Sequence, residues 1–348
     1  MYAEGGLLQD WNLPSLSNTT YHASYHTLDD IYGFLRDLAA VYPDKVKIIP
    51  LGHTGESREL YALEIGSSNT KSHDPKGETS TNEKLSFLIT GTQHAREWVA
   101  SAAALYLAHA LAANASEPNS LTHLLDDYNF YIIAVPNPDG YVYTWEHDRF
   151  WYKNRLYLGP HAQCVGLDMN RNWGYKFKSG SVKMAPSAAK PKDSCSHWYP
   201  GHRPFQAPEV NNIALYIESL PTFDAFVDLR SYGQMLSAPY SYSCNKSPKD
   251  AEDQLEAASG AAYAVRKSHG TGFTTGTLCS TLYRAPGNIV DWMYATMGVK
   301  YSYAAHLRDT GTYGFALPPQ WIRPVGEETA KIVEYLARFI ANKQKKVI

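Results

Sequence analysis

Residues 85–90, LSFLIT, form an apolar run that leads directly into residues 91–98, GTQHAREW. This order predicts a buried strand that ends in a tight turn, followed by a helix over the apolar residues 99–113. His94 and Glu97 stand three positions apart, so both side chains can point the same way from a first helical turn. An imidazole and a carboxylate that converge are two of the three protein ligands that a catalytic zinc needs. On spacing alone, the simpler interpretation is a surface histidine and a glutamate favoured by the helix dipole, and only the neighbouring sequence changes that interpretation.

The rest of the chain alternates between helical and strand-like patterns. Thr27 is the expected N-cap of an amphipathic helix over residues 28–41, which Pro43 stops. Further strands are predicted at residues 46–50, 60–65, 129–135, 225–229 and 299–305, and further helices at residues 208–220, 249–269, 288–297 and 327–343. The remaining segments are expected to be irregular: an exposed loop at 67–84, a turn at 136–140 and a long stretch at 141–203.

This alternation, without an internal repeat or a linker, predicts a single α/β domain over residues 25–348, with a central sheet covered by helices on both faces. Residues 1–24 are polar and irregular and are interpreted as an N-terminal tail or linker. A chain of 348 residues with 44% apolar side chains is long enough to bury a sizeable core. The formal net charge of -2 gives no reason to expect nucleic acid or an anionic membrane surface as a partner, and no apolar run reaches membrane-spanning length.

Cysteine and asparagine positions favour an oxidising compartment. The four cysteines form no closely spaced pair of the kind found in zinc knuckles or redox motifs, so two structural disulfides are expected. Three glycosylation acceptors, at Asn18, Asn114 and Asn245, agree with that compartment. The N-terminal residues lack the basic-then-apolar pattern of a secretory signal and resemble the start of a trimmed chain. We therefore expect a secreted protein, extracellular or in a cell wall, whose signal peptide is absent from this chain.

Several short motifs follow one another in a fixed order. They are HAREW at 94–98, PNPDGY at 136–141, RFWYKNR at 149–155, DMNRNW at 168–173, SYGQ at 231–234, LYRAPG at 282–287, VDW at 290–292 and LRDTGTYGF at 307–315. In this combination the chain resembles the zinc carboxypeptidases of the A/B type, over roughly residues 20 to 342. The resemblance implies a mixed eight-stranded sheet between layers of helices, with the site at strand ends. It also implies that Cys164 pairs with Cys195 and Cys244 with Cys279. Members of the family are made with a signal and an inhibitory prodomain, and this sequence shows neither.

The resemblance further implies which residues hold a peptide. Asn170 and Arg171 match the pair that grips the terminal carboxylate, a task suited to a planar guanidinium. Arg96 and Arg149 match residues that line the approach, and Tyr283 matches the mobile tyrosine that closes over the substrate.

The pocket for the terminal side chain is expected at Val290, with Phe315 beside it. An apolar side chain at the first of these positions implies that the terminal residue is aliphatic or aromatic, because a basic one would need a carboxylate there. Asn288 is bulkier than the glycine usual nearby, which implies a narrowed pocket.

Three positions that carry the chemistry depart from the family pattern. Arg230 stands where the third zinc ligand should be a histidine, Tyr152 where an arginine should polarise the scissile carbonyl, and His306 where a carboxylate should activate water. Arginine stays protonated and has no lone pair to offer a metal. The sequence therefore predicts no zinc or only weakly bound zinc, and a buried ion pair between Arg230 and Glu97.

A rearranged site is the alternative. His94, Glu97 and His306 would then hold zinc, and Arg230 would polarise the carbonyl. The simpler interpretation makes His306 a hydrogen-bonded histidine in a dry pocket and Tyr152 a packing residue.

Three functions follow from these alternatives, and the sequence leaves open whether the chain is an enzyme. The first is a pseudoenzyme with a degenerate site that still recognises peptide or protein C-termini with apolar terminal side chains, similar to inactive fungal carboxypeptidase-like proteins of the cell wall. The second is an active metallocarboxypeptidase with the rearranged zinc site. The third is a structural or interaction protein whose cleft is vestigial. The oligomeric state is not indicated.

Overall fold

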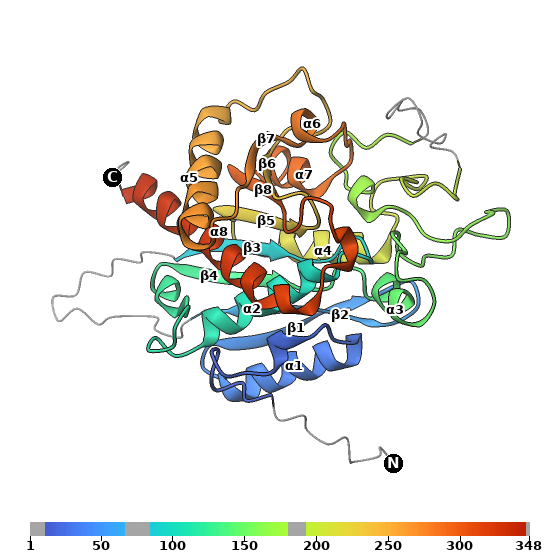
Figure 1. Cartoon of the computed structure of the whole chain (residues 1–348). Helices are drawn as coiled ribbons and strands as arrows, with labels where there is room; N and C mark the ends of the chain where they lie inside the picture. Colours follow the sequence, from blue (N-terminus) through green and yellow to red (C-terminus); the bar gives the residue numbers. More distant parts are fainter. Residues whose placement is uncertain (1–10, 67–83, 180–192, 346–348) are drawn as a thin grey trace, which may run out of the picture.

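Eight strands form one mixed sheet through the middle of the molecule (Figure 1). This computed structural model describes residues 11–66, 84–179 and 193–345. The strands are β1 (Val46–His53), β2 (Glu59–Ile65), β3 (Leu85–Thr90), β4 (Tyr128–Ile133), β5 (Ala225–Arg230), β6 (Met235–Ala238), β7 (Thr274–Thr277) and β8 (Tyr301–His306). Their order across the sheet is β1-β2-β4-β3-β5-β8-β6-β7. The four central strands run parallel, and antiparallel pairings join β2 and β6 to them. The predicted α/β class and the implied eight-stranded sheet are confirmed.

Helices cover both faces of this sheet. They are α1 (Leu28–Val41), α2 (Trp98–Ala112), α3 (Pro138–Glu146), α4 (Pro208–Ser219), α5 (Ala251–His269), α6 (Leu278–Thr281), α7 (Ile289–Ala295) and α8 (Ile322–Lys345). Five 3-10 turns join them: η1 (Tyr21–Ala23), η2 (Thr122–Asp126), η3 (Met169–Arg171), η4 (Gly314–Ala316) and η5 (Pro319–Trp321).

Alternate residues of the central strands enter two separate cores, because successive side chains of a strand point to opposite faces. In β3, Phe87 and Ile89 lie in a core with α1, α2, α5 and α8. Leu88, between them, lies in a core with α4 and α7 on the other face. The apolar run at residues 85–90 is thus buried on both sides, as a central parallel strand must be.

The first helix begins and ends where the sequence predicts. Thr27 and Asp30 form a reciprocal capping box at its N-terminus, with both backbone-to-side-chain distances 3.3 Å. The chain leaves the helix at Tyr42, directly before Pro43.

Several elements differ from the prediction. Residues 136–146 are not a turn and an irregular stretch but contain α3, which Asn137 caps by accepting a hydrogen bond from the backbone of Gly140 at 3.0 Å. A proline at the first helical position favours this start, and the glycine and aromatic residues that follow obscure it. Strands β6 and β7 are not predicted from the residues because each is only four residues long. Helix α8 begins earlier than predicted, since Pro324 is tolerated in a first turn.

Part of the segment interpreted as a tail belongs to the folded domain. Leu13, Leu16 and Tyr21 are buried in the core next to α1 and α2. Their apolar side chains are spaced irregularly among polar residues, so no helical or strand period marks them. The predicted loop at 67–84 lies almost wholly outside the described residues.

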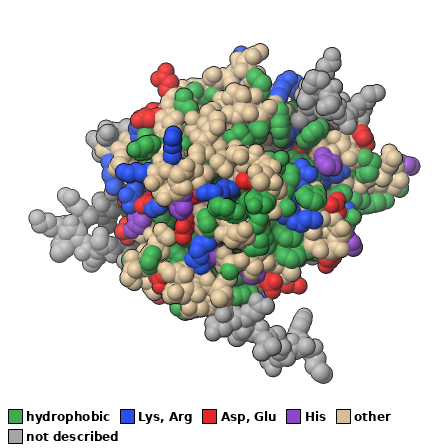
Figure 2. Space-filling model, in the orientation of Figure 1, with side chains coloured by type: hydrophobic (Ala, Val, Ile, Leu, Met, Phe, Trp, Pro, Cys, Tyr) green, Lys and Arg blue, Asp and Glu red, His purple; other side chains and the backbone are tan. Residues whose placement is uncertain are grey.

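Surface features agree with the sequence in part. Cys164 is joined to Cys195 and Cys244 to Cys279, as the resemblance implied. Asn18, Asn114 and Asn245 are exposed. Basic and acidic side chains lie among each other on the face drawn in Figure 2. None of the helices in the described ranges has both the length and the apolar character needed to cross a membrane.

Candidate functional site

The carboxyl ends of three parallel strands bring the predicted residues to one edge of the sheet. His94 and Glu97 follow β3, Arg230 ends β5 and His306 ends β8. Because β5 lies between β3 and β8, and Arg230 pairs directly with His306 in the strand register, their side chains meet at this edge. Ligand sites of open α/β sheets form at this kind of edge.

A tight turn after β3 fixes the first two residues. A Cβ atom at Gly91 would lie 2.1 Å from the carbonyl oxygen of Ala134, so only glycine fits there. The amide of Asn137 donates to the carbonyl of Gln93, in this turn, at 3.0 Å and to the carbonyl of Lys153, in a neighbouring segment, at 3.1 Å. The backbone N–H of Ala95 donates to the carbonyl of Tyr152 at 3.1 Å. These contacts hold the aromatic ring of Tyr152 directly beside the turn.

Arg230 is paired with Glu97, as predicted. Its Nε donates to Oε2 at 2.9 Å, and its Nη2 donates to Oε1 at 3.1 Å. The same Nη2 contacts Nδ1 of His94. The backbone N–H of Ser231 also donates to Oε2 of Glu97, at 3.1 Å. All these groups are buried, so the pair is a charge-assisted contact in a medium of low polarity.

A carboxylate orients the ring of His94. Its Nε2 donates to Oδ1 of Asp168 at 2.8 Å, which makes Nδ1 of the neutral ring an acceptor. This nitrogen faces the guanidinium of Arg230 and also lies 3.1 Å from Oε1 of Glu97, and of these two groups only the guanidinium can donate to it. On the flat side, the ring of Tyr152 stacks on the imidazole with centroids 3.7 Å apart. Tyr152 is therefore a packing residue, as predicted, and burial raises the pKa of its hydroxyl well above the ordinary value.

The residues at this edge do not fit a zinc ion. The lone pairs that would face the metal, on Nδ1 of His94 and on both oxygens of Glu97, face the guanidinium of Arg230 instead. Across the part of the chain that the structure describes, no three side chains of His, Cys, Asp or Glu are placed to hold a metal ion. The alternative set of His94, Glu97 and His306 is therefore not assembled here.

The buried charges at this edge compensate one another. Burial alone would raise the pKa of Glu97, but the charge of Arg230 lowers it below the ordinary value. Burial raises the pKa of Asp228, although Arg230 lies close and opposes the shift, with Nη1 3.6 Å from Oδ2. The guanidinium stays charged, since the two carboxylates raise the pKa of Arg230 against the effect of burial.

His306 is close to this charged group and stays neutral. Burial, and then the charge of Arg230, lower its pKa to about 3. Its Nδ1 has no hydrogen-bond partner among the described residues, which differs from the hydrogen-bonded histidine that the sequence favours. Glu97, whose charge acts on His306, already accepts three hydrogen bonds from Arg230 and Ser231.

Arg171 differs from Arg230 in its free donors. Its Nη1 donates to the backbone oxygen of Asn170 at 2.8 Å and lies 3.8 Å from Oδ2 of Asp168. Its Nε and Nη2 are buried and make no hydrogen bond of good geometry within the described part of the chain, although Asp168 and Tyr283 lie close enough to raise the pKa of this guanidinium against the effect of burial. Tyr283 is 38% exposed, and its ring centre lies 5.6 Å from this guanidinium. Gly287, at φ +73°, packs on the backbone here, because a Cβ would lie 2.4 Å from the carbonyl oxygen of Arg171.

Arg149 and Arg96 lie between the turn after β3 and the segment after β8. Arg149 donates to the carbonyl of Arg96 at 2.9 Å and to the carbonyl of Phe315 at 2.5 Å, and it lies 3.7 Å over the ring of Trp98. Arg96 lies 4.0 Å over the ring of Phe315. These contacts join the turn after β3 to the segment that follows β8.

Of the residues assigned to the pocket for the terminal side chain, Val290 and Asn288 are buried and Phe315 is half-buried. Val290 is 5% exposed and belongs to the core of α4 and α7. Asn288 caps α7: its Oδ1 accepts from the backbone of Asp291 at 2.9 Å, and its Nδ2 donates to the carbonyl of Ala285 at 2.6 Å. Both polar groups of the Asn288 side chain are therefore used in hydrogen bonds to nearby backbone.

Sequence reasoning does not single out two carboxylates of the site. Asp168 holds His94, and Asp228 accepts hydrogen bonds from Thr90 at 2.7 Å and from Gln93 at 2.8 Å. The sequence could have indicated Asp168. A buried histidine usually donates a hydrogen bond from its second ring nitrogen to a carboxylate or carbonyl, and Asp168 is the first residue of the DMNRNW motif.

The chain is similar to known proteins over most of its length. A family model described as zinc carboxypeptidase matches residues 31–332. The chain is 36% identical over 316 residues to a metallocarboxypeptidase A-like protein of Trichophyton verrucosum, covering 90% of this chain and 69% of that protein. It is 35% identical over 308 residues to carboxypeptidase A4 of Mus musculus, covering 88% of this chain and 68% of that protein. It is 33% identical over 343 residues to the inactive metallocarboxypeptidase ecm14 of Sclerotinia sclerotiorum, covering 93% of this chain but 55% of that protein.

Solved structures agree in fold. Thrombin-activatable fibrinolysis inhibitor matches with a TM-score of 0.84 and 32% identity, covering 96% of this chain and 79% of the other. The bovine protein in complex with tick carboxypeptidase inhibitor matches with a TM-score of 0.80 and 34% identity, covering 93% of this chain and all of the other. The order of the motifs, the sheet and the matched range lead to one conclusion: this chain belongs to the zinc carboxypeptidase family.

Proposed function

We propose that this protein is a carboxypeptidase-like pseudoenzyme that binds peptide or protein C-termini and does not cut them. The observation that carries the proposal is the position of the Arg230 guanidinium, which is bonded to both oxygens of Glu97 and faces His94. A fixed cation there balances Glu97 without a metal ion. We therefore expect this protein to bind zinc weakly or not at all.

The substituted residues are also poor replacements for the catalytic groups. A general base works best when its pKa is near the operating pH, and the pKa of His306 is about 3. Tyr152 carries a neutral hydroxyl and cannot supply a positive charge to a developing oxyanion. Loss of a general base and of an electrostatic clamp would each remove roughly 10²–10³-fold of rate. The similar protein ecm14 bears the name of an inactive enzyme.

The free donors of Arg171 support recognition of a carboxylate. A buried guanidinium with two unsatisfied nitrogens, Nε and Nη2, is costly unless a ligand supplies acceptors. A terminal carboxylate has the planar pair of oxygens that suits it. Asn170 is held beside it, since its Oδ1 accepts from the backbone of Ile289 at 3.0 Å. Val290 and Phe315 favour apolar terminal side chains, and the two disulfides favour an extracellular or cell-wall location.

Peptides that differ only at the C-terminal group test this function. We expect a peptide with a free terminal carboxylate and an apolar last residue to bind about 10-fold or more tightly than its C-terminal amide, because charge-assisted hydrogen bonds are lost in the amide. Arg171→Gln should remove this preference. Arg203→Gln, at an exposed arginine, is the matched control and should keep it.

Calorimetric titration measures the affinity of the wild type and of the two variants for the acid and the amide peptide. Equal binding of acid and amide, or binding of neither, would contradict recognition of C-termini and favour a structural role. Release of terminal residues that a chelator suppresses would instead favour an active enzyme with a rearranged zinc site.

A further inference from the structure

Histidines join the N-terminal segment, residues 11–26, to the body of the domain. His22 and His26 belong to the segment, and His109 lies near the end of α2. The segment also packs through η1 against α8. Other polar bonds also attach the segment, among them those from Arg323 and Tyr42 to its backbone carbonyls.

A hydrogen-bond chain runs through two of the rings. Nε2 of His109 lies 2.8 Å from the carbonyl oxygen of Leu13, and Nε2 of His22 lies 3.1 Å from Nδ1 of His109. A carbonyl can only accept, so Nε2 of His109 carries a proton, its Nδ1 is the acceptor, and His22 is the donor. A proton added to His109 would have to go to Nδ1, so the bond to His22 would survive only if His22 moved its own proton away from Nε2.

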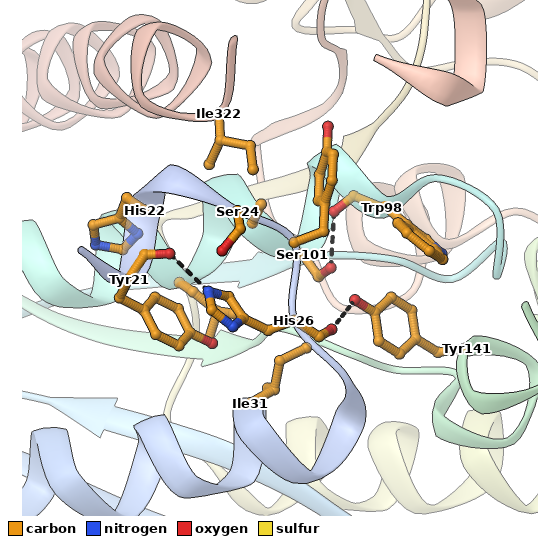
Figure 3. A pocket seen from close by; sticks show the side chains of 12 residues that line it. Tyr21, His22, Ser24, His26, Ile31, Trp98, Ser101, Tyr141 and Ile322 are labelled. Carbon is orange, nitrogen blue, oxygen red and sulfur yellow. Dashed lines mark hydrogen bonds between the residues drawn. The ribbon is translucent and has the colours of Figure 1, made fainter. Parts of the chain in front are cut away.

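The third ring binds within the segment (Figure 3). Nε2 of His26 donates to the carbonyl of Tyr21 at 2.7 Å, and the two rings stack with centroids 4.0 Å apart. The hydroxyl of Tyr141, from α3, donates to the carbonyl of His26 at 2.7 Å. His22 and His26 line a small pocket of about 10 Å³ between the segment and the domain body, close to the smallest size that admits one water molecule.

Charged groups from each neighbouring element act on these rings. Arg323 of α8 donates to the carbonyls of Leu16 and Thr19, both at 3.0 Å, and opposes a second positive charge on His22 and His109. Asp30 of α1 favours the charged form of His26, and Glu117 favours that of His109.

Burial outweighs the two carboxylates. It lowers the pKa of His109 to about 4 and that of His22 well below the ordinary value, and it lowers that of His26 less. All three rings are therefore neutral in the closed form at neutral pH.

We propose that residues 11–26 form an acid-released clasp, closed at neutral pH by the chain of neutral histidines and opened when those rings take up protons. A histidine with a depressed pKa binds fewer protons in the closed form than in the open form. Closing is therefore fully favoured above the ordinary histidine pKa of about 6.5 and weakens as the pH falls below it. If opening returns His109 alone to its ordinary state, the opening equilibrium constant rises about 25-fold between pH 7.5 and pH 5.0.

Hydrogen exchange measured by mass spectrometry on the whole protein tests the clasp. After correction for the intrinsic exchange rate, opening of residues 11–26 should rise about 10-fold or more from pH 7.5 to pH 5.0. Strand β3 should show no such change. A change of similar size in both, or none in the segment, would overturn the proposal.

A non-titrating substitution separates protonation from general loosening. His109→Gln keeps a donor for Leu13 and an acceptor for His22 but takes no proton, so the part of the pH dependence that comes from His109, about 25-fold between pH 7.5 and pH 5.0, should disappear. His147→Gln is the control, because the side chain of His147 is 59% exposed and lies outside the segment's contacts. If the segment of His109→Gln opens with falling pH as much as that of the wild type, the proposal is overturned. If the segment of this variant is already open at both pH values, the comparison of residues 11–26 with β3 in the wild-type protein decides the question.

Discussion

Replacing Arg230 with histidine should give a protein that retains about one zinc ion per molecule after dialysis, where the wild type retains far less. The substitution removes the positive charge from between His94 and Glu97 and supplies a ring nitrogen in its place. The supports of the other two ligands are already present, since Asp168 holds His94 and the backbone of Ser231 holds Glu97. Such supporting contacts orient metal ligands and raise their affinity.

Arg230→Gln is the matched control for this gain. It removes the same charge but offers no imidazole, so only two protein ligands remain. Elemental analysis after dialysis against zinc and then against buffer compares the three proteins. If Arg230→His holds no more zinc than Arg230→Gln, the ligand geometry at this edge is not intact. We expect little peptidase activity even in the zinc-loaded variant, since Tyr152 and His306 are unchanged.

Removing the partner of Arg230 should destabilise the whole domain. Glu97→Gln leaves a buried guanidinium whose remaining ion-pair partner among the described residues is Asp228, at 3.6 Å, and the expected loss in the free energy of unfolding is about 3–5 kcal/mol. The double variant Glu97→Gln, Arg230→Gln removes both charges and should lose distinctly less, because no buried charge is left uncompensated.

Urea unfolding of the wild type, Glu97→Gln, Arg230→Gln and the double variant gives the four free energies of unfolding that this double-mutant cycle needs. Glu256→Gln is a useful control, because its ion pair with Lys343 is exposed and should contribute almost nothing to stability. Equal destabilisation by Glu97→Gln and by the double variant would mean that the pair does not interact as the structure describes it.

The elements that the sequence predicts well are those with one strong signal. The run at 85–90 is apolar throughout and bounded by a glycine, so its burial as a central strand follows directly. The helix at 28–41 carries both a capping box and a stopping proline. By contrast, β7 consists of Thr274–Thr277, whose residues have no alternation to read, and it exists because β6 pairs with it. Helix α3 is not predicted because the glycine and aromatic residues that follow its N-cap have low helix propensity and hide the signal of the cap.

The site shows the same division. The pairing of Arg230 with Glu97 could be predicted because a buried cation needs a nearby carboxylate, and the motif spacing places one there. The roles of Asp168 and Asp228 could not, since their partners come from segments that lie about 74 and 138 positions away along the chain and only the fold brings them together. The same holds for His109, whose ring looks like part of an apolar helix until the N-terminal segment packs on it.

The zinc content of the wild-type protein tests most directly whether Arg230 has replaced the metal. The protein is purified without a metal-affinity tag, dialysed against excess zinc and then against metal-free buffer, and its metal content is measured by elemental analysis. We predict well under one zinc per molecule, since the guanidinium of Arg230 takes the place of the metal. A content near one zinc per molecule, with His94 and Glu97 bound to it in a crystal structure, would contradict this prediction.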